Sequence, residues 1–132
     1  MFTLTLVFNH DKTHVLMCDH KKLNAFNFIG GKSNILEDLT VASYRELFEE
    51  TGIPKEAIDL KFVRQESVTT NQTCWSMFIT AGVLKEDVEL KPEKNELLWV
   101  DINDIEVFLS AYGDGNCYTF LKESMRVLNI NA

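Results

Sequence analysis

The segment from Asp38 to Pro54 places the strongest constraint on what this chain can fold into, because both ends of a helix are marked in it. Asp38 is a favoured N-cap residue, whereas Gly52 and Pro54 are typical of a helix end and of the chain just beyond it. The sequence therefore predicts a helix that runs from about Asp38 to Thr51.

Acidic and apolar side chains separate around this predicted helix. At ~100° per residue, Glu46, Glu49 and Glu50 fall within an arc of roughly 100°. We expect the apolar stripe on the opposite side to pack against a sheet. That stripe consists of Val41, Tyr44 and Phe48.

The clustered glutamates favour a divalent cation. Like charges three or four residues apart destabilise a helix by about 0.2–0.5 kcal/mol per pair, so a hard cation between them would be stabilising. Mg²⁺ takes oxygen ligands, keeps several waters and is completed by substrate phosphates. The alternative interpretation is the solvated acidic face of a surface helix.

Strand patterns flank the helix on both sides. The predicted strands are 2–9, 14–19, 25–29, 60–69, 73–84 and 97–100, and the further helices are 104–109 and 118–128. The first two strands should form a hairpin around a polar turn at 10–13. This order predicts an α/β (α+β) fold, with a mixed β-sheet between α-helices, in a single domain over 1–132.

The net charge limits the classes of partner. A chain of 132 residues with a formal charge of −7 does not suit a protein that binds nucleic acid polymers by neutralising phosphates. A small anionic substrate is still possible if a metal supplies the positive charge.

The cysteine pattern and the hydropathy of the sequence indicate the cellular compartment of the protein. Three cysteines without a CxxC pair predict reduced thiols, and none has the setting of a catalytic nucleophile. We find no basic start of a signal peptide and no apolar run near the ~20 residues of a membrane span. We therefore expect a cytoplasmic protein without a membrane partner, and the sequence leaves monomer or homodimer open.

Residues 31–53 resemble the Nudix box, Gx5Ex7REUxEExGU, in which U is aliphatic. A chance match per window is on the order of 10⁻¹⁰ at average residue frequencies. The resemblance implies the Nudix fold, with a catalytic loop-helix-loop at 31–53, and an enzyme that hydrolyses nucleoside diphosphates linked to another group. All nine specified positions agree: Gly31, Glu37, Arg45, Glu46, Leu47, Glu49, Glu50, Gly52 and Ile53.

The resemblance also implies a metal site. Glu46, Glu49 and Glu50 match the family's metal ligands, and Glu46 is in addition a candidate base for the attacking water. The backbone carbonyl of Gly30 is a further candidate ligand. The implied cofactor is Mg²⁺, with Mn²⁺ as a substitute.

The remaining positions of the box support the ligands. Arg45 is expected to orient the glutamates by charge-assisted hydrogen bonds. Glu37 is expected to pair with Arg45 or to brace the loop. Gly31 should permit the tight loop before the helix, and Leu47 and Ile53 should be core residues.

A glutamate outside the box commonly completes the metal site in this family. Glu93 and Glu96, just before the predicted strand 97–100, are the candidates, and we favour Glu93. The other is then an ordinary solvated loop acid.

A second, weaker resemblance concerns the substrate. Residues 26–32 are similar to the stretch that enters the box in MutT-like triphosphatases of oxidised purine nucleotides. There, an asparagine at the position of Asn27 hydrogen-bonds the purine edge. Lys32, next to Gly31, is a candidate phosphate contact. The same resemblance places Thr3 and Lys21 near the base and sugar.

Residues near the C-terminus extend the resemblance. Tyr112 would stack on the base and Asp114 would hydrogen-bond it. A tryptophan is more usual at the position of Tyr112, and Gly115 replaces a second acid of that group.

Each of these candidates has an ordinary structural alternative. Asn27 can cap a strand end, Thr3 can fill a cross-strand position, and 113–115 has the composition of a turn.

The sequence thus predicts an Mg²⁺-dependent hydrolase that converts a (deoxy)nucleoside triphosphate to a monophosphate and pyrophosphate. An oxidised purine such as 8-oxo-dGTP is one candidate substrate. One alternative is a Nudix hydrolase of a dinucleoside polyphosphate, ADP-ribose or a nucleotide sugar. The other is a regulator with the same fold that binds a nucleotide without hydrolysing it.

Overall fold

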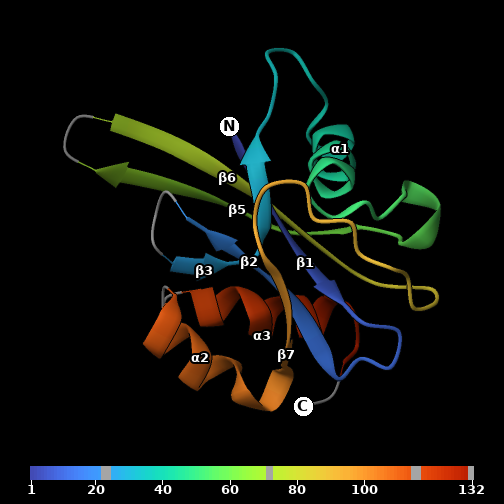
Figure 1. Cartoon of the computed structure of the whole chain (residues 1–132). Helices are drawn as coiled ribbons and strands as arrows, with labels where there is room; N and C mark the ends of the chain where they lie inside the picture. The colour runs from blue at the N-terminus through green and yellow to red at the C-terminus, as the bar shows by residue number, and fades with distance from the viewer. Residues whose placement is uncertain (22–24, 71–72, 114–116, 131–132) are drawn as a thin grey trace.

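A central mixed sheet separates one helix from two others in the computed structural model, which describes residues 1–21, 25–70, 73–113 and 117–130 (Figure 1). The strands are β1 (Phe2–Phe8), β2 (His14–His20), β3 (Ala25–Asn27), β4 (Ile29–Lys32), β5 (Lys61–Thr70), β6 (Thr73–Val83) and β7 (Leu97–Asp101). The helices are α1 (Leu39–Thr51), α2 (Ile105–Tyr112) and α3 (Tyr118–Val127), with short 3₁₀ turns at Lys55–Ala57 and Ile102–Asp104.

Strand β1 organises the seven-stranded sheet, whose main order is β3-β2-β1-β6-β5. It pairs in parallel with β6, from Phe2 opposite Met77 to Phe8 opposite Val83. The other pairings are antiparallel, and they include β1 with β4 and β2 with β7. The expected hairpin of β1 and β2 is present, but it pairs only between Phe8 and Val15, because β4 occupies the edge of β1 over its first residues.

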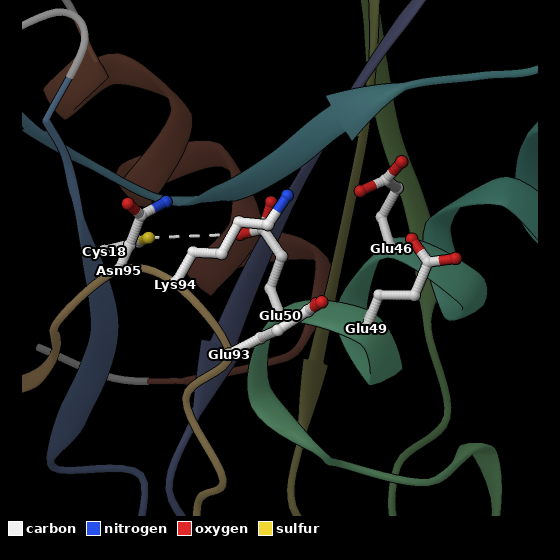
Figure 2. A pocket seen from close by; sticks show the side chains of 7 residues that line it. All are labelled: Cys18, Glu46, Glu49, Glu50, Glu93, Lys94 and Asn95. Carbon is white, nitrogen blue, oxygen red and sulfur yellow. Dashed lines mark hydrogen bonds between the residues drawn. The ribbon is translucent and has the colours of Figure 1, made fainter.

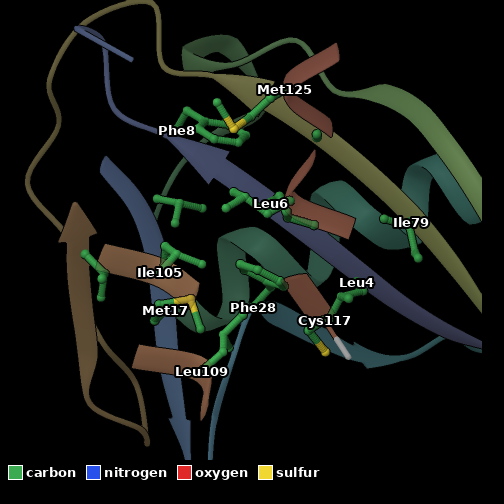
Figure 3. Close-up of a cluster of buried hydrophobic side chains, with 14 of the residues drawn as sticks. Leu4, Leu6, Phe8, Met17, Phe28, Ile79, Ile105, Leu109, Cys117 and Met125 are labelled. Carbon is green, nitrogen blue, oxygen red and sulfur yellow. The ribbon is translucent and has the colours of Figure 1, made fainter. Parts of the chain in front are cut away.

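Two apolar clusters form because alternate residues of a strand point to opposite faces. In β1, Leu4, Leu6 and Phe8 face α2 and α3, and Figure 3 shows them packed with Met17, Phe28 and Leu109. Val7 instead joins the cluster beneath α1. That second cluster is Val7, Leu16, Cys18, Ile29, Leu47, Ile53, Ile58 and Leu84.

Helix α1 begins and ends where its sequence predicts. The Asp38 carboxylate accepts hydrogen bonds from the N–H groups of Thr40 and Val41, at 2.9 and 3.1 Å, which is an N-cap. At the other end Gly52 adopts φ of 76°, a left-handed conformation that favours glycine, and its N–H donates to the Phe48 carbonyl.

The expectation about the buried face of this helix is wrong for Val41 and Phe48, whereas Tyr44 packs against the second cluster. Val41 and Phe48 are each 57% exposed, and Tyr44 is half-buried, with its hydroxyl accepting a hydrogen bond from the Leu60 N–H at 2.9 Å. The residues that face the sheet are Ala42, Ser43, Leu47 and Thr51.

This shift of face brings two carboxylates to the sheet. At ~100° per residue, Glu46 and Glu50 lie in the same half of the helix as Ala42, Ser43 and Leu47. The small side chains of Ala42 and Ser43 let α1 lie close to the sheet, so this half of the helix can hold the glutamates between two layers. Glu46 and Glu50 are therefore partly buried on the side of α1 that faces the sheet, whereas Glu49 is exposed.

Smaller differences concern element bounds. The predicted strand 25–29 is divided into β3 and β4, which pair with β2 and β1, and the helix predicted over 104–109 continues to Tyr112. Within the described residues, no helix has the length and hydropathy that crossing a membrane requires.

Replacement of Gly52 by alanine tests the helix end. The left-handed φ and a contact of the new Cβ with the Lys91 Cβ, 2.9 Å away, should lower the free energy of unfolding by about 1–2 kcal/mol. Urea denaturation measures this change. Thr40→Ala, an exposed change on the same helix, should stay within about 0.5 kcal/mol, and equal stability of both variants would contradict the assignment.

Candidate active site

Three glutamates of α1 share a pocket with the segment that precedes β7 (Figure 2). The pocket has a volume of about 140 Å³. Helix α1 contributes one wall, β2 contributes Cys18, and the third wall comes from residues 93–95. We call it the carboxylate pocket, and its lining is Cys18, Glu46, Glu49, Glu50, Glu93, Lys94 and Asn95.

Arg45 connects the glutamates of the predicted motif. Its guanidinium holds Glu37 with two hydrogen bonds, Nε to Oε2 at 2.8 Å and Nη2 to Oε1 at 2.9 Å. The remaining nitrogen, Nη1, donates to Glu46 at 3.1 Å and to Glu49 at 3.0 Å. The hydrogen bonding of Glu37 to Arg45 is the largest cause of the lowered pKa of Glu37. The side chain of Arg45 is therefore committed to orienting carboxylates, as the sequence predicted.

Gly31 provides the space into which the Glu46 carboxylate fits. A Cβ built at residue 31 would overlap that carboxylate. On the same strand pair, the buried Thr3 hydroxyl donates to the Gly31 carbonyl at 3.3 Å. The expected role of Gly31 in a tight loop is wrong, because Gly31 lies within β4 and pairs with Thr3. The absence of a side chain at this position instead leaves room for Glu46.

Burial changes the acidity of the inward-facing glutamates. Desolvation raises the pKa of Glu50 to about 7, and the neighbouring charges of Glu46, Glu49 and Glu93 act in the same direction. The pKa of Glu46 is also raised by burial, although the positive charge of Arg45 opposes the shift. Ionisation of either carboxyl group therefore lowers the free energy of unfolding, and a bound cation would reduce this cost.

Cys18 contacts the most buried of these carboxylates. Its thiol is inaccessible to solvent and donates to Glu50 Oε2 at 3.9 Å. Burial and the charge of Glu50 raise the pKa of Cys18 to about 12. A thiol in that state is a poor nucleophile.

The donors fit a hard divalent cation by their chemistry. Carboxylate oxygens from α1 and from Glu93 border one small pocket, and the space beside Gly31 accommodates the Glu46 carboxylate. Over the described ranges, no three His, Cys, Asp or Glu side chains already form a ligand set. Arg45 holds Glu46 and Glu49, whereas Glu50 contacts Cys18, so binding of an ion requires side-chain rotation.

The two candidates for an additional ligand lie in different places. Glu93 lines the carboxylate pocket and its charge contributes to the raised pKa of Glu50. Glu96 is exposed and is not among the pocket residues, and its carbonyl accepts a hydrogen bond from the Asp19 N–H at 2.9 Å.

The residues predicted to bind the nucleoside are separate from this pocket. Asn27 accepts a hydrogen bond from the Phe28 N–H through its side chain, at 2.8 Å, which is the local capping role given as its alternative. The side chains of Lys21 and Lys32 are exposed. None of these three residues lines the carboxylate pocket.

A second hollow, of about 410 Å³, contains Tyr112. Tyr112 is 61% exposed and its ring contacts Phe108, with centroids 5.3 Å apart. Asp19 lines this hollow, whereas Cys18 lines the carboxylate pocket, so the two lie on opposite faces of β2. Asp114, the predicted base contact, is outside the described residues. The full lining is Asp19, Ala25, Phe26, Ala111, Tyr112 and Gly113.

Motif analysis missed three pocket residues, Cys18, Lys94 and Asn95. Cys18 and Asn95 lie 77 positions apart in the sequence and meet only because β7 pairs with β2. The one signal available in advance was the position of Lys94 and Asn95 directly after Glu93.

The Gly31→Ala variant tests whether the position of Glu46 depends on the space beside Gly31. The added methyl group should displace the Glu46 carboxylate and weaken Mn²⁺ binding by about tenfold or more, with an unchanged circular dichroism spectrum. Electron paramagnetic resonance of free Mn²⁺ gives the affinity. Ser33→Ala, whose hydroxyl bonds the Met1 carbonyl, is the control. Unaltered Mn²⁺ affinity in Gly31→Ala would show that Glu46 does not depend on this space.

The raised pKa of Glu50 predicts a pH dependence of stability in metal-free protein. The native state holds the proton up to a higher pH than the unfolded chain, so stability should fall as pH rises from about 4.5 to about 7. With solvent screening, the loss is about 1–2 kcal/mol. Urea denaturation at several pH values measures it, and Glu50→Gln should remove most of the decline. A steady rise in stability over this range in both proteins would refute the assignment.

Comparisons with known proteins place the chain in a family. Its sequence matches the NUDIX domain family over residues 3–119. No significant match was found among curated proteins. Similar folds occur in an Ap4A hydrolase from C. elegans (TM-score 0.81, 13% identity, covering 97% of this chain and 96% of that one). The dihydroneopterin triphosphate pyrophosphohydrolase of E. coli is also similar (TM-score 0.77, 16% identity, 99% and 95% covered).

A third similar structure comes from a study of MutT from Aliivibrio salmonicida and Vibrio cholerae (TM-score 0.65, 19% identity, 93% of each chain covered). At these identities the structures show a shared fold, and they confirm the mixed sheet between helices. The match over residues 3–119, together with the complete motif on α1, establishes that the chain belongs to the Nudix family.

Proposed function

We propose that this chain is an Mg²⁺-dependent pyrophosphohydrolase that converts a (deoxy)nucleoside triphosphate to the monophosphate and pyrophosphate. The observation that carries the proposal is the carboxylate pocket, in which Glu46, Glu49 and Glu50 meet Glu93 from a distant part of the chain. Four carboxylates line this pocket of about 140 Å³, and after rotation of their side chains they would offer a divalent cation its oxygen ligands. Such a cation would let a polyphosphate approach a protein with a charge of −7.

The residues that would hold the metal are Glu46, Glu49, Glu50 and the Gly30 carbonyl, with Glu93 preferred over Glu96 as the additional ligand. Bound Mg²⁺, or Mn²⁺ in its place, neutralises phosphate charge and makes water a better nucleophile near neutral pH. The support for Glu93 is its position in the pocket.

Glu46 is the proposed base. Its carboxylate is partly buried beside Gly31, and burial raises its pKa, which favours acceptance of a proton from the attacking water. Arg45 does not need to touch the substrate in this scheme. Its bonds to Glu37, Glu46 and Glu49 fix the direction of the carboxylates.

Recognition of the nucleoside is assigned to the hollow beside Tyr112. Its volume of about 410 Å³ suits a base and part of a sugar, and Tyr112 offers an exposed aromatic ring for stacking. Asn27, Lys21 and Asp114 are the proposed polar contacts, with Lys32 beside Gly31 at the phosphates. Thr3 is buried opposite Gly31 and bonded to its carbonyl, so a contact of Thr3 with the nucleoside requires that its hydroxyl leave this cross-strand position. For Asn27, reading a base requires that its side chain leave the Phe28 N–H.

The leading substrate is a free (deoxy)nucleoside triphosphate, with an oxidised purine such as 8-oxo-dGTP as one candidate, and not a nucleic acid polymer. A dinucleoside polyphosphate is the second candidate, because an Ap4A hydrolase shares the fold at a TM-score of 0.81. ADP-ribose, nucleotide sugars and binding without hydrolysis complete the alternatives. A cytoplasmic location remains a prediction.

A product-resolved hydrolysis screen with Mg²⁺ tests the proposal. The substrates are standard and oxidised nucleoside triphosphates, diadenosine tetraphosphate and ADP-ribose. We expect a monophosphate and pyrophosphate from a nucleoside triphosphate, with turnover reduced at least about 10²-fold in Glu50→Gln. Glu56→Gln, an exposed glutamate outside the pocket, should retain full turnover.

Other outcomes of the screen separate the alternatives. Preference for diadenosine tetraphosphate with ATP as a product would replace the substrate and keep the chemistry. Turnover of every compound at the level of Glu50→Gln, combined with nucleotide binding by calorimetry, would favour a regulator. Full activity of Glu50→Gln would refute the metal-ligand assignment.

A further inference from the structure

The segment from Lys91 to Glu96, which we call the 91–96 strap, is attached at both ends to the elements that form the carboxylate pocket. At one end, the Lys91 N–H donates to the Thr51 carbonyl of α1 at 2.8 Å. At the other, the Glu96 carbonyl accepts a hydrogen bond from the Asp19 N–H of β2 at 2.9 Å. The strap therefore keeps a fixed position relative to both walls of the pocket.

The middle of the strap provides the third wall. Glu93, Lys94 and Asn95 are consecutive and all line the pocket, as Figure 2 shows. Asn95 is half-buried, and its side chain is hydrogen-bonded to the Cys18 thiol, which in turn contacts Glu50. These contacts hold Asn95 against the inner wall of the pocket, and they fix the backbone next to Lys94, whose own side chain is exposed.

Lys94 is the one basic side chain in the lining of the carboxylate pocket. The other nearby cation, Arg45, is committed to Glu37, Glu46 and Glu49. For Lys94, no hydrogen bond or ion pair occurs with any of the described residues. An ammonium group that lines a pocket of four carboxylates without bonding one of them is free to bind another anion there.

We infer that Lys94 binds a phosphate group of the polyphosphate substrate, and that its positive charge weakens binding of the metal before the substrate arrives. This inference rests on the proposed function. The ammonium group of Lys94 and a divalent cation in the same pocket repel one another electrostatically. A substrate phosphate removes the repulsion because it accepts charge-assisted hydrogen bonds from the ammonium and binds the metal as well.

Two binding constants measured on the same protein test the inference without any turnover. Mn²⁺ is titrated into metal-free protein and followed by electron paramagnetic resonance, and pyrophosphate is then titrated into Mn²⁺-saturated protein by calorimetry. In Lys94→Met, the loss of a like charge should tighten Mn²⁺ binding by about two- to fivefold. The loss of the phosphate contact should weaken pyrophosphate binding by about tenfold.

The controls separate charge from structure. Lys94→Arg keeps the positive charge, so both constants should stay close to those of the wild type. Lys91→Met removes the same charge three residues away, outside the pocket lining, and should change neither constant by more than about twofold.

The opposite signs of the two effects make the result decisive. If Lys94→Met weakens both ligands, the side chain merely supports the strap, and the inference is overturned. It is also overturned if neither constant changes, or if wild-type protein does not bind pyrophosphate. If the expected changes occur in a protein that hydrolyses no nucleotide, the proposed function fails while the role of Lys94 in phosphate binding stands.

Discussion

The enclosure of Glu46 and Glu50 between α1 and the sheet is the constraint on which the site depends. Ionised carboxylates are costly in such a position, and the raised pKa of Glu50, to about 7, expresses that cost. Two features of the structure reduce it. Arg45 offers its guanidinium to Glu46, and the missing side chain at Gly31 leaves room for the same carboxylate. A divalent cation would remove much of the remaining cost, so the repulsion among the carboxylates would favour binding of a metal ion.

The rest of the fold fixes α1 closely enough to maintain this arrangement. Ala42 and Ser43 are small, which allows a close approach of the helix to the sheet, and Leu47 anchors it in the apolar cluster that includes Val7 and Leu16. The N-cap at Asp38 and the left-handed Gly52 determine where the helix starts and stops. Because the 91–96 strap is bonded to the end of α1 and to β2, the same anchoring also determines where Glu93 and Lys94 lie.

Local patterns could be predicted from the sequence because their causes are local. Asp38 and Gly52 marked the helix correctly, alternation marked the strands, and the bonds of Arg45 to Glu37 and Glu46 followed from the motif. The buried face of α1 could not be predicted in this way. Val41 and Phe48 are apolar and lie seven residues apart, on one side of the helix. Each is nevertheless 57% exposed, because the sheet packs against the small side chains of Ala42 and Ser43 beside two glutamates.

The sequence by itself determined the family, the helix that carries the proposed metal ligands and the identity of the clustered carboxylates, since each of these follows from residue types at short spacing. The tertiary structure decided what surrounds them. Cys18, Glu93 and Lys94 reach one pocket through the pairing of β2 with β7, a contact between segments about 80 residues apart that no local pattern encodes. It also placed the hollow of Tyr112 on the opposite face of β2, because consecutive residues of a strand point in opposite directions.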